Sequence, residues 1–248
     1  MKKILAICLA LCLLLSFAAC SKSDNNNEQS QTQATEAAQT DIQPSDRIVE
    51  PTNVEGTGSQ LTAKDYSFTA FGKTYTLAQT TLQEFLDDGW TIEDEYADAN
   101  KEIDSYSYLD INGMSKDGVN LYYLRFVNFS KSSAKPLSEC KLLQFAINYS
   151  GVNIVGGEDQ TATGADVTTV FGFNEKYCMA DVMDKFEAVG IGHYEQDYDT
   201  YYTLRSNQKS DDPDINYTIE AHFSHDTQKL QAMTVYISTY TNGEFDEA

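Results

Sequence analysis

Basic residues are scarce in this chain of 248 residues, because 17 Lys and Arg stand against 38 Asp and Glu and give a formal net charge of −21. Nucleic-acid binding depends on Lys and Arg side chains that neutralise phosphates. A polybasic membrane-surface patch needs the same residues. The composition therefore excludes a nucleic-acid partner and a basic membrane-binding surface.

The motifs of common enzyme classes are also missing. The sequence contains no G-x-S-x-G, no H-E-x-x-H, no phosphate-binding loop and no G-x-G-x-x-G. It has only three histidines, His193, His222 and His225, and a single tryptophan, Trp90, where sugar clefts usually carry several. We therefore predict that the protein is not an enzyme and needs no cofactor.

Cysteines are few once their positions are considered. Of the five, Cys8 and Cys12 lie in the apolar amino-terminal segment and Cys20 directly follows it. Cys140 and Cys178 remain, and neither has the C-x-x-C spacing of a redox or zinc site. In an exported protein these two thiols either form a disulfide or stay as buried, free thiols.

The amino terminus has the organisation of an export signal. Met1-Lys2-Lys3 is positively charged, and residues 4–19 carry no charge and are dominated by Leu, Ala and Ile. The end of this segment, Phe17-Ala18-Ala19-Cys20, resembles the lipobox of bacterial lipoproteins. The resemblance implies removal of residues 1–19, lipidation of Cys20, and a lipid anchor on the extracytoplasmic face of the cell membrane. An ordinary cleaved signal, in which Cys20 has no such role, is the alternative.

Residues 20–60 are rich in Asn, Gln, Ser, Thr, Glu and Ala and have no apolar periodicity. Such a segment buries too little apolar surface to offset the entropy of ordering it. We therefore predict a lipidated Cys20 followed by a disordered tether that separates the folded part from the membrane.

The pattern from residue 61 onward predicts an α+β fold of two similar halves, residues 61–150 and 151–248. Each half would have one or more short helices followed by an antiparallel sheet of about four strands. Thr81 and Glu84 form a capping box for the first helix, which Gly89 ends. Thr163 and Asp166 give a similar signal in the second half, before a brief helical run to Phe171-Gly172, and a further helix follows over residues 180–189. Strands are expected over residues 66–70, 74–77, 104–111, 119–129, 139–149, 193–197, 200–206, 215–224 and 230–239.

Three pieces of the first half carry a resemblance to a known family: Phe71-Gly72-Lys73-x-Tyr75-x-Leu77, Phe85-Leu86-x-x-Gly89-Trp90, and the stretch from Phe126-Val127-Asn128 to Cys140. They resemble uncharacterised lipoproteins of Gram-positive anaerobes. The plan of the two halves is similar to the tandem repeat of beta-lactamase inhibitor proteins. The resemblance covers about residues 61–241 and implies a binding module, but it assigns no functional residue to this chain.

Tyrosine is the unusual residue, with 16 copies that all lie between Tyr66 and Tyr240. Tyr198, Tyr201 and Tyr202 crowd one stretch together with acidic residues. Because tyrosine is enriched at protein interfaces, these three side chains form our candidate binding face. Cross-strand packing of tyrosines within a sheet is the alternative.

Glu220 and His222 are the candidate metal ligands, with His225 or His193 as a further one. Alternate residues of a strand point to the same side, so both side chains can face one ion. The solvated face of an amphipathic strand explains the same pattern.

Taken together, the sequence predicts a membrane-anchored lipoprotein that binds a protein or peptide without catalysis. A small-ligand or metal carrier of the envelope is the first alternative, and an envelope hydrolase is the second.

Overall fold

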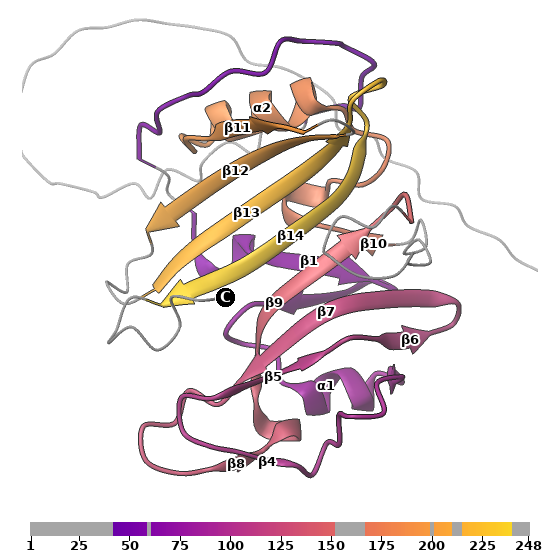
Figure 1. The fold of residues 1–248 in the computed structure, drawn as a ribbon, viewed down its shortest axis with the longest axis vertical. Coiled ribbons are helices and arrows are strands. Elements are labelled where there is room, and N and C mark those ends of the chain that lie inside the picture. Colours follow the sequence, from indigo (N-terminus) through magenta and orange to yellow (C-terminus); the bar gives the residue numbers. More distant parts are fainter. Residues whose placement is uncertain (1–41, 59–60, 152–166, 199–200, 210–214, 240–248) are drawn as a thin grey trace, which may run out of the picture. The chain divides into compact units, whose positions relative to one another are not determined.

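The computed structural model describes residues 42–58, 61–151, 167–198, 201–209 and 215–239. Within these residues, nine strands form one antiparallel sheet in the order β11-β12-β13-β14-β9-β7-β6-β3, with β5 paired to β7 (Figure 1). The strands of this sheet are β3 (Thr91–Ile92), β5 (Tyr108–Ile111), β6 (Met114–Lys116), β7 (Val119–Val127), β9 (Lys141–Asn148), β11 (Tyr194–Asp197), β12 (Tyr201–Lys209), β13 (Ile215–Ser224) and β14 (Leu230–Thr239).

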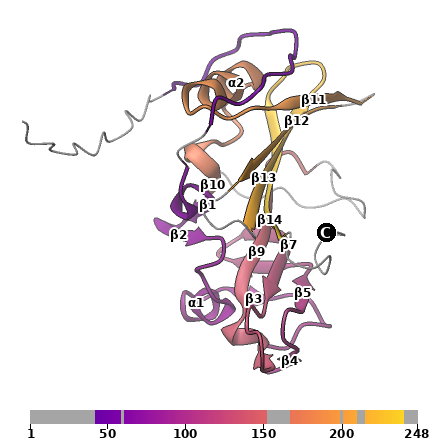
Figure 2. The same cartoon turned by 90° about the vertical axis from the view of Figure 1, so that its left-hand side faces the viewer.

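Smaller elements lie beside this sheet. A three-stranded sheet consists of β1 (Ser67–Ala70), β2 (Lys73–Thr76) and β10 (Val167–Thr168), and β4 (Glu102–Ile103) pairs with β8 (Lys135–Pro136). The helices are α1 (Leu82–Asp87) and α2 (Met179–Ala188), with short 3₁₀ turns at Ala63–Asp65, Leu137–Glu139 and Val170–Gly172. Two views at right angles place both helices and the three-stranded sheet on one side of the nine-stranded sheet (Figures 1 and 2).

The predicted α+β fold of two helix-plus-sheet halves is wrong. Of the described residues, 44% lie in strands and 14% in helices, and one sheet runs through both supposed halves. Strand β9 of the first half pairs with β14 of the second, with Phe145 opposite Val235, and β1 pairs with β10. Alternation along a strand shows which side chains share a face but not which strand lies next to it, so the pattern could not reveal this pairing.

Most of the individual elements were predicted correctly because their signals are local. The capping box between Thr81 and Glu84 is present at α1, and Gly89 follows the helix with a positive φ of 87°. Helix α2 and strands β7, β9 and β11 to β14 lie within a few residues of their predicted ranges. The helical run expected before Gly172 is β10 and a 3₁₀ turn, and the capping signal at residues 163 and 166 lies outside the described residues.

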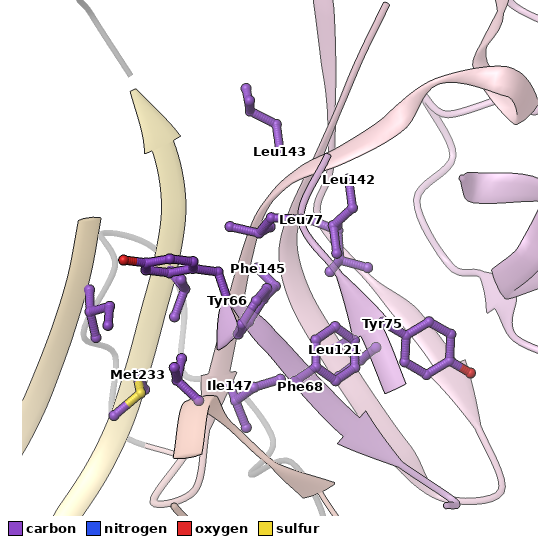
Figure 3. Close-up of a cluster of buried hydrophobic side chains, with 14 of the residues drawn as sticks. Tyr66, Phe68, Tyr75, Leu77, Leu121, Leu142, Leu143, Phe145, Ile147 and Met233 are labelled. Carbon is purple, nitrogen blue, oxygen red and sulfur yellow. The ribbon is translucent and has the colours of Figure 1, made fainter. Parts of the chain in front are cut away.

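The core lies between the nine-stranded sheet and the elements on its covered side. Figure 3 shows Phe68 near Phe145 and Ile147 of β9, and Tyr66 reaching toward β14. The Tyr66 ring stacks on Tyr217 with the two centroids 3.8 Å apart. Aromatic pairs of this kind add to the free energy gained by burying apolar surface. The part of the covered face where these rings meet is therefore a packing surface.

Residues 42–58 lie along the outer side of α2 and then reach β11 (Figures 1 and 2), and we call them the strap. Val49 N–H donates to the Gln228 side chain at 2.9 Å, and the Gln228 amide donates back to Val49 C=O at 2.7 Å. Val54 and His193 form an antiparallel bridge with both backbone hydrogen bonds made. This part of the predicted tether is therefore packed against the fold and is not a free linker.

The strongest attachment of the strap is at the start of α2. Ser45 N–H and Oγ donate to the Asp181 carboxylate at 2.9 and 2.5 Å, and Cys178 N–H donates to it at 2.9 Å. Burial acts to raise the pKa of Asp181, but the hydrogen bonds from Cys178 and Ser45 outweigh it and hold the pKa below its ordinary value. The carboxylate therefore joins strap and helix while it is ionised.

Asp181→Ala is expected to lower the free energy of unfolding by about 2 kcal/mol, because it leaves three donors without their acceptor in a site where the carboxylate is 1% exposed. Asp184→Ala is the matched control, since Asp184 lies on the same helix, is half exposed and pairs with Arg47 at the surface. We expect it to cost less than about 1 kcal/mol. Urea unfolding at pH 7 measures both, and equal losses would contradict this role of Asp181.

Candidate functional site

The face of the nine-stranded sheet that points away from the helices carries polar and aromatic side chains. On β12, Leu204 and Ser206 point into the core, so Tyr201, Thr203 and Arg205 point to the opposite side. The same side of the sheet continues on β13, where His222 lies opposite Thr203 and Glu220 lies opposite Arg205.

Six tyrosines from five strands and one strand end share this side, and we call it the tyrosine face. Tyr194 pairs with Arg205, and Tyr122 is linked through Ala146 to Thr234 of β14. The members are Tyr108, Tyr122, Tyr194, Tyr198, Tyr201 and Tyr236. Tyr108 and Tyr198 are the most exposed among them, at 39% and 43%. Tyrosines from both halves of the sequence are therefore brought onto one surface.

The predicted binding face needs one correction. The Tyr198 and Tyr201 rings stack at 4.7 Å between centroids, and the Tyr201 ring meets His222 edge-on at 5.6 Å. Tyr202 lies opposite Phe223 on the covered side, and its ring stacks on His225 at 4.5 Å. The structure brings Tyr198 and Tyr201 together and separates Tyr202 from them, because adjacent residues of a strand point to opposite faces.

The charged groups of the tyrosine face are paired with one another. Arg205 Nε lies 3.1 Å from Glu220 Oε1, and its guanidinium donates to the Tyr236 hydroxyl at 2.7 Å. At the other end, Arg125 binds both carboxylate oxygens of Asp110 at 2.6 and 3.0 Å. Each pair sums to zero charge, so these two ion pairs orient the aromatic rings beside them and add no net charge to the face.

Tyr108 is oriented by this second pair. The Arg125 guanidinium carbon lies 4.2 Å from the centre of the Tyr108 ring. A cation over a ring face is an attractive contact that limits the ring's freedom. The exposed Tyr108 is therefore held in place before any partner binds, which reduces the entropy lost on association.

The candidate metal ligands lie as predicted but are engaged elsewhere. Glu220 and His222 share the tyrosine face, yet Glu220 pairs with Arg205, and His222 Nδ1 lies 3.0 Å from Thr203 Oγ1. His193 packs near Phe186, with 5.9 Å between the ring centroids, under the strap on the covered side. Within the described ranges no group of three or more His, Cys, Asp or Glu side chains could hold a metal ion. The Glu220 and His222 side chains are therefore bound to neighbouring residues of the sheet.

The two remaining cysteines are free and buried. Burial raises the pKa of Cys140 to about 11, so this thiol stays protonated at neutral pH and is a poor nucleophile. Cys178 is the residue before α2, and its sulfur lies 3.3 Å from Ser45 Oγ of the strap. Of the two alternatives for these cysteines, a disulfide or buried free thiols, the structure agrees with the second.

A cleft of about 790 Å³ lies where the strap passes β11 and β12, and we call it the strap cleft. It is lined by strap residues 53–56 and 58, by residues 190 and 192–194, and by Asn207 and Gln208 of β12. Glu55 is the one carboxylate in this lining, and the lining holds no Ser, Thr or Cys. Among the described lining residues there is therefore no carboxylate pair of the kind most glycosidases use, and Tyr194 carries the one hydroxyl.

The fold and the tyrosine face define a chain built around one antiparallel sheet with an aromatic surface. No known protein family, curated protein or solved structure matches it. The resemblance to lipoproteins and to beta-lactamase inhibitor proteins therefore stays a prediction, apart from the two-half fold that the sheet contradicts. None of the described helices has the length and apolarity to span a membrane.

Proposed function

We propose that this chain is a lipoprotein, anchored to the extracytoplasmic face of the cell membrane through lipid on Cys20, that binds a protein or peptide partner without catalysis. The partner would bind the tyrosine face. In this proposal the spacer between the lipid and the strap covers residues 21–41.

The observation that carries the proposal is the gathering of six tyrosines on one sheet face. Fold stability alone requires aromatic side chains on the covered side, where Phe68, Phe145 and Tyr217 pack. It does not require partly exposed rings such as Tyr108 and Tyr198 on the other side. Tyrosine provides a large contact area with few rotatable bonds, and this makes it common at the centre of interfaces.

Charge indicates the chemistry of the partner. The chain carries a net charge of −21, and the ion pairs of the tyrosine face are internally neutral. A partner with exposed Lys or Arg would meet a favourable long-range field and open ring faces for cation–π contacts. We therefore propose a neutral to basic partner.

Replacing Tyr198 and Tyr201 together by serine is expected to weaken partner binding at least tenfold. The experiment immobilises the full chain, purified from membranes, exposes it to envelope and culture-supernatant extract, and identifies bound proteins by mass spectrometry. The affinity of an identified partner is then measured for the double variant. Thermal unfolding of each variant confirms that the fold is retained.

Tyr96→Ser is the matched control, because Tyr96 is 77% exposed, lies between β3 and β4 and is not a member of the tyrosine face. It should bind the partner as the wild type does. Tyr108→Ser probes the far end of the face independently. A partner that binds the Tyr198/Tyr201 double variant and the Tyr108 variant with wild-type affinity would contradict the tyrosine face as the binding site.

A further inference from the structure

The strap cleft contains an incompletely paired strand edge. Strand β11 covers one side of β12 only from Tyr202 to Arg205, whereas β13 pairs with β12 from Tyr201 to Lys209. Among the described strands, none pairs with residues 206–209 on the side of β11. Asn207 and Gln208 of this stretch line the cleft.

The hydrogen bonds of β11 show which backbone groups point into the cleft. Glu195 N–H donates to the Asn53 side chain of the strap at 2.9 Å, and His193 N–H and C=O both bond to Val54. The backbone N–H and C=O groups of His193 and Glu195 therefore point away from β12. Those of Tyr194, the residue between them, point toward β12 and its partner Arg205. The N–H and C=O groups of every second residue in a strand point to the same side. Those of Asn207 therefore point to the same side as those of Arg205, but beyond the residue at which β11 begins.

The volume of the cleft, about 790 Å³, leaves room for an extended backbone. Glycines 56, 58, 190 and 192 are among its lining residues and let the strap pack closely against residues 190–192. Gly56 and Gly192 approach so closely that a Cβ on Gly192 would lie 2.3 Å from Gly56 N, which holds the strap at a set position. By contrast, the outer edge at the start of β11 is covered, since Val54 bonds to His193 and the Asn53 side chain accepts from Glu195 N–H. Within the described part of the chain, the sheet thus has a stretch of protected edge and, beside it, an unpaired one.

We propose that an extended segment of the partner protein enters the strap cleft and pairs with β12 at Asn207, continuing the sheet where β11 ends. This inference rests on the proposed function, because it takes the partner to be a polypeptide. Main-chain hydrogen bonds to an exposed strand edge are a common mode of peptide recognition. Glu55 in the lining and the net charge of −21 favour a segment with Lys or Arg.

The probe is a phage-displayed library of random 12-residue peptides, selected on the full chain. The most enriched peptides are synthesised, and their affinities are measured by isothermal titration. We expect enrichment of peptides with Lys or Arg and high strand propensity. N-methylation of alternate peptide residues should weaken binding at least tenfold in one of the two alternate sets only, because an added strand uses the N–H groups of a single edge.

Asn207→Pro should weaken the same peptides at least tenfold. Its N–H points away from β13, so proline removes the edge donor while the pairing of β12 with β13 stays. Asp197→Pro is the matched control, since Asp197 has the same outward backbone direction on β11 but lies away from the cleft. It should change the affinity less than twofold, and thermal unfolding tests whether both variants fold.

Several results would overturn the proposal. They are a library without enriched peptides, peptides that bind Asn207→Pro as tightly as the wild type, and affinities that alternate N-methylation leaves unchanged. Protection of the Asn207 amide from hydrogen exchange without peptide would show that another part of the chain occupies the edge. Peptides that lose affinity in the Tyr198/Tyr201 double variant but not in Asn207→Pro would support the tyrosine face and overturn the edge. A protein partner whose affinity falls in the Tyr198/Tyr201 double variant but not in Asn207→Pro would likewise support the tyrosine face and overturn the edge. The two proposals can therefore fail separately.

Discussion

Phe85→Ala is expected to lower the free energy of unfolding by about 3–5 kcal/mol, the largest loss we expect from a single substitution. The Phe85 side chain of α1 is fully buried. Its ring lies 4.3 Å from Tyr75 and 5.7 Å from Phe126, measured between centroids, and also packs near Phe68 and Trp90. Truncation leaves a cavity between α1, the three-stranded sheet and β7, and rigid neighbours on three sides limit how far it can close.

Urea unfolding monitored by circular dichroism measures this loss. Tyr96→Ala is the control, because its ring is 77% exposed and its removal should change the free energy by less than about 0.5 kcal/mol. The slope of the unfolding free energy against urea should be unchanged, which would show that only stability differs. A loss below about 1 kcal/mol would mean that α1 is not part of the same core as the sheet.

Helix α1 also shows what the sequence could predict. Its boundaries depend on Thr81, Glu84 and Gly89, which all lie within nine residues, and its buried side chains follow from helical spacing. Strands such as β13 were predictable for the same reason, since alternation is a local property. The strand order was not predictable, because β9 pairs with β14, a strand that begins more than 80 residues after β9 ends in the sequence.

The candidate site was only partly predictable. Alternation correctly put Glu220 and His222 on one face, but it also required Tyr201 and Tyr202 to point apart, which the predicted binding face overlooked. Arg205 and Tyr236 were missed, although their strands were predicted, because their contact depends on the register across β13. Their positions in a strand were the only signal in the sequence.

The strap could not be predicted because its attachment is polar and distant in sequence. Ser45 meets Asp181 across 136 positions, and Val49 meets Gln228 across 179. Composition and apolar periodicity report on burial of apolar surface and are insensitive to such contacts. The close approach of Gly56 and Gly192 likewise depends on backbone positions that the sequence does not reveal.

His222 should make the folded state sensitive to acid. Its side chain is 7% exposed beneath Tyr201, and burial lowers its pKa to about 4, against about 6.5 in an unfolded chain. At pH 7 the imidazole is neutral in both states and has no effect. As the pH falls below 6.5, the unfolded chain binds a proton first, so the folded state loses stability until the pH is below the folded pKa. The expected loss from this residue between pH 7 and pH 4 is about 3 kcal/mol.

Comparison with His222→Gln isolates this effect from the carboxylates, which also titrate in acid. Glutamine keeps a hydrogen-bonding partner for Thr203 but does not ionise, so the stability of the wild type relative to the variant should fall by about 3 kcal/mol between pH 7 and pH 4. His225→Gln is the matched control for the exchange of a histidine for glutamine, because the His225 side chain is 42% exposed. Urea unfolding across this pH range measures the difference. A difference that stays constant with pH would mean that the imidazole is accessible to water, and therefore that Tyr201 does not cover it in the tyrosine face.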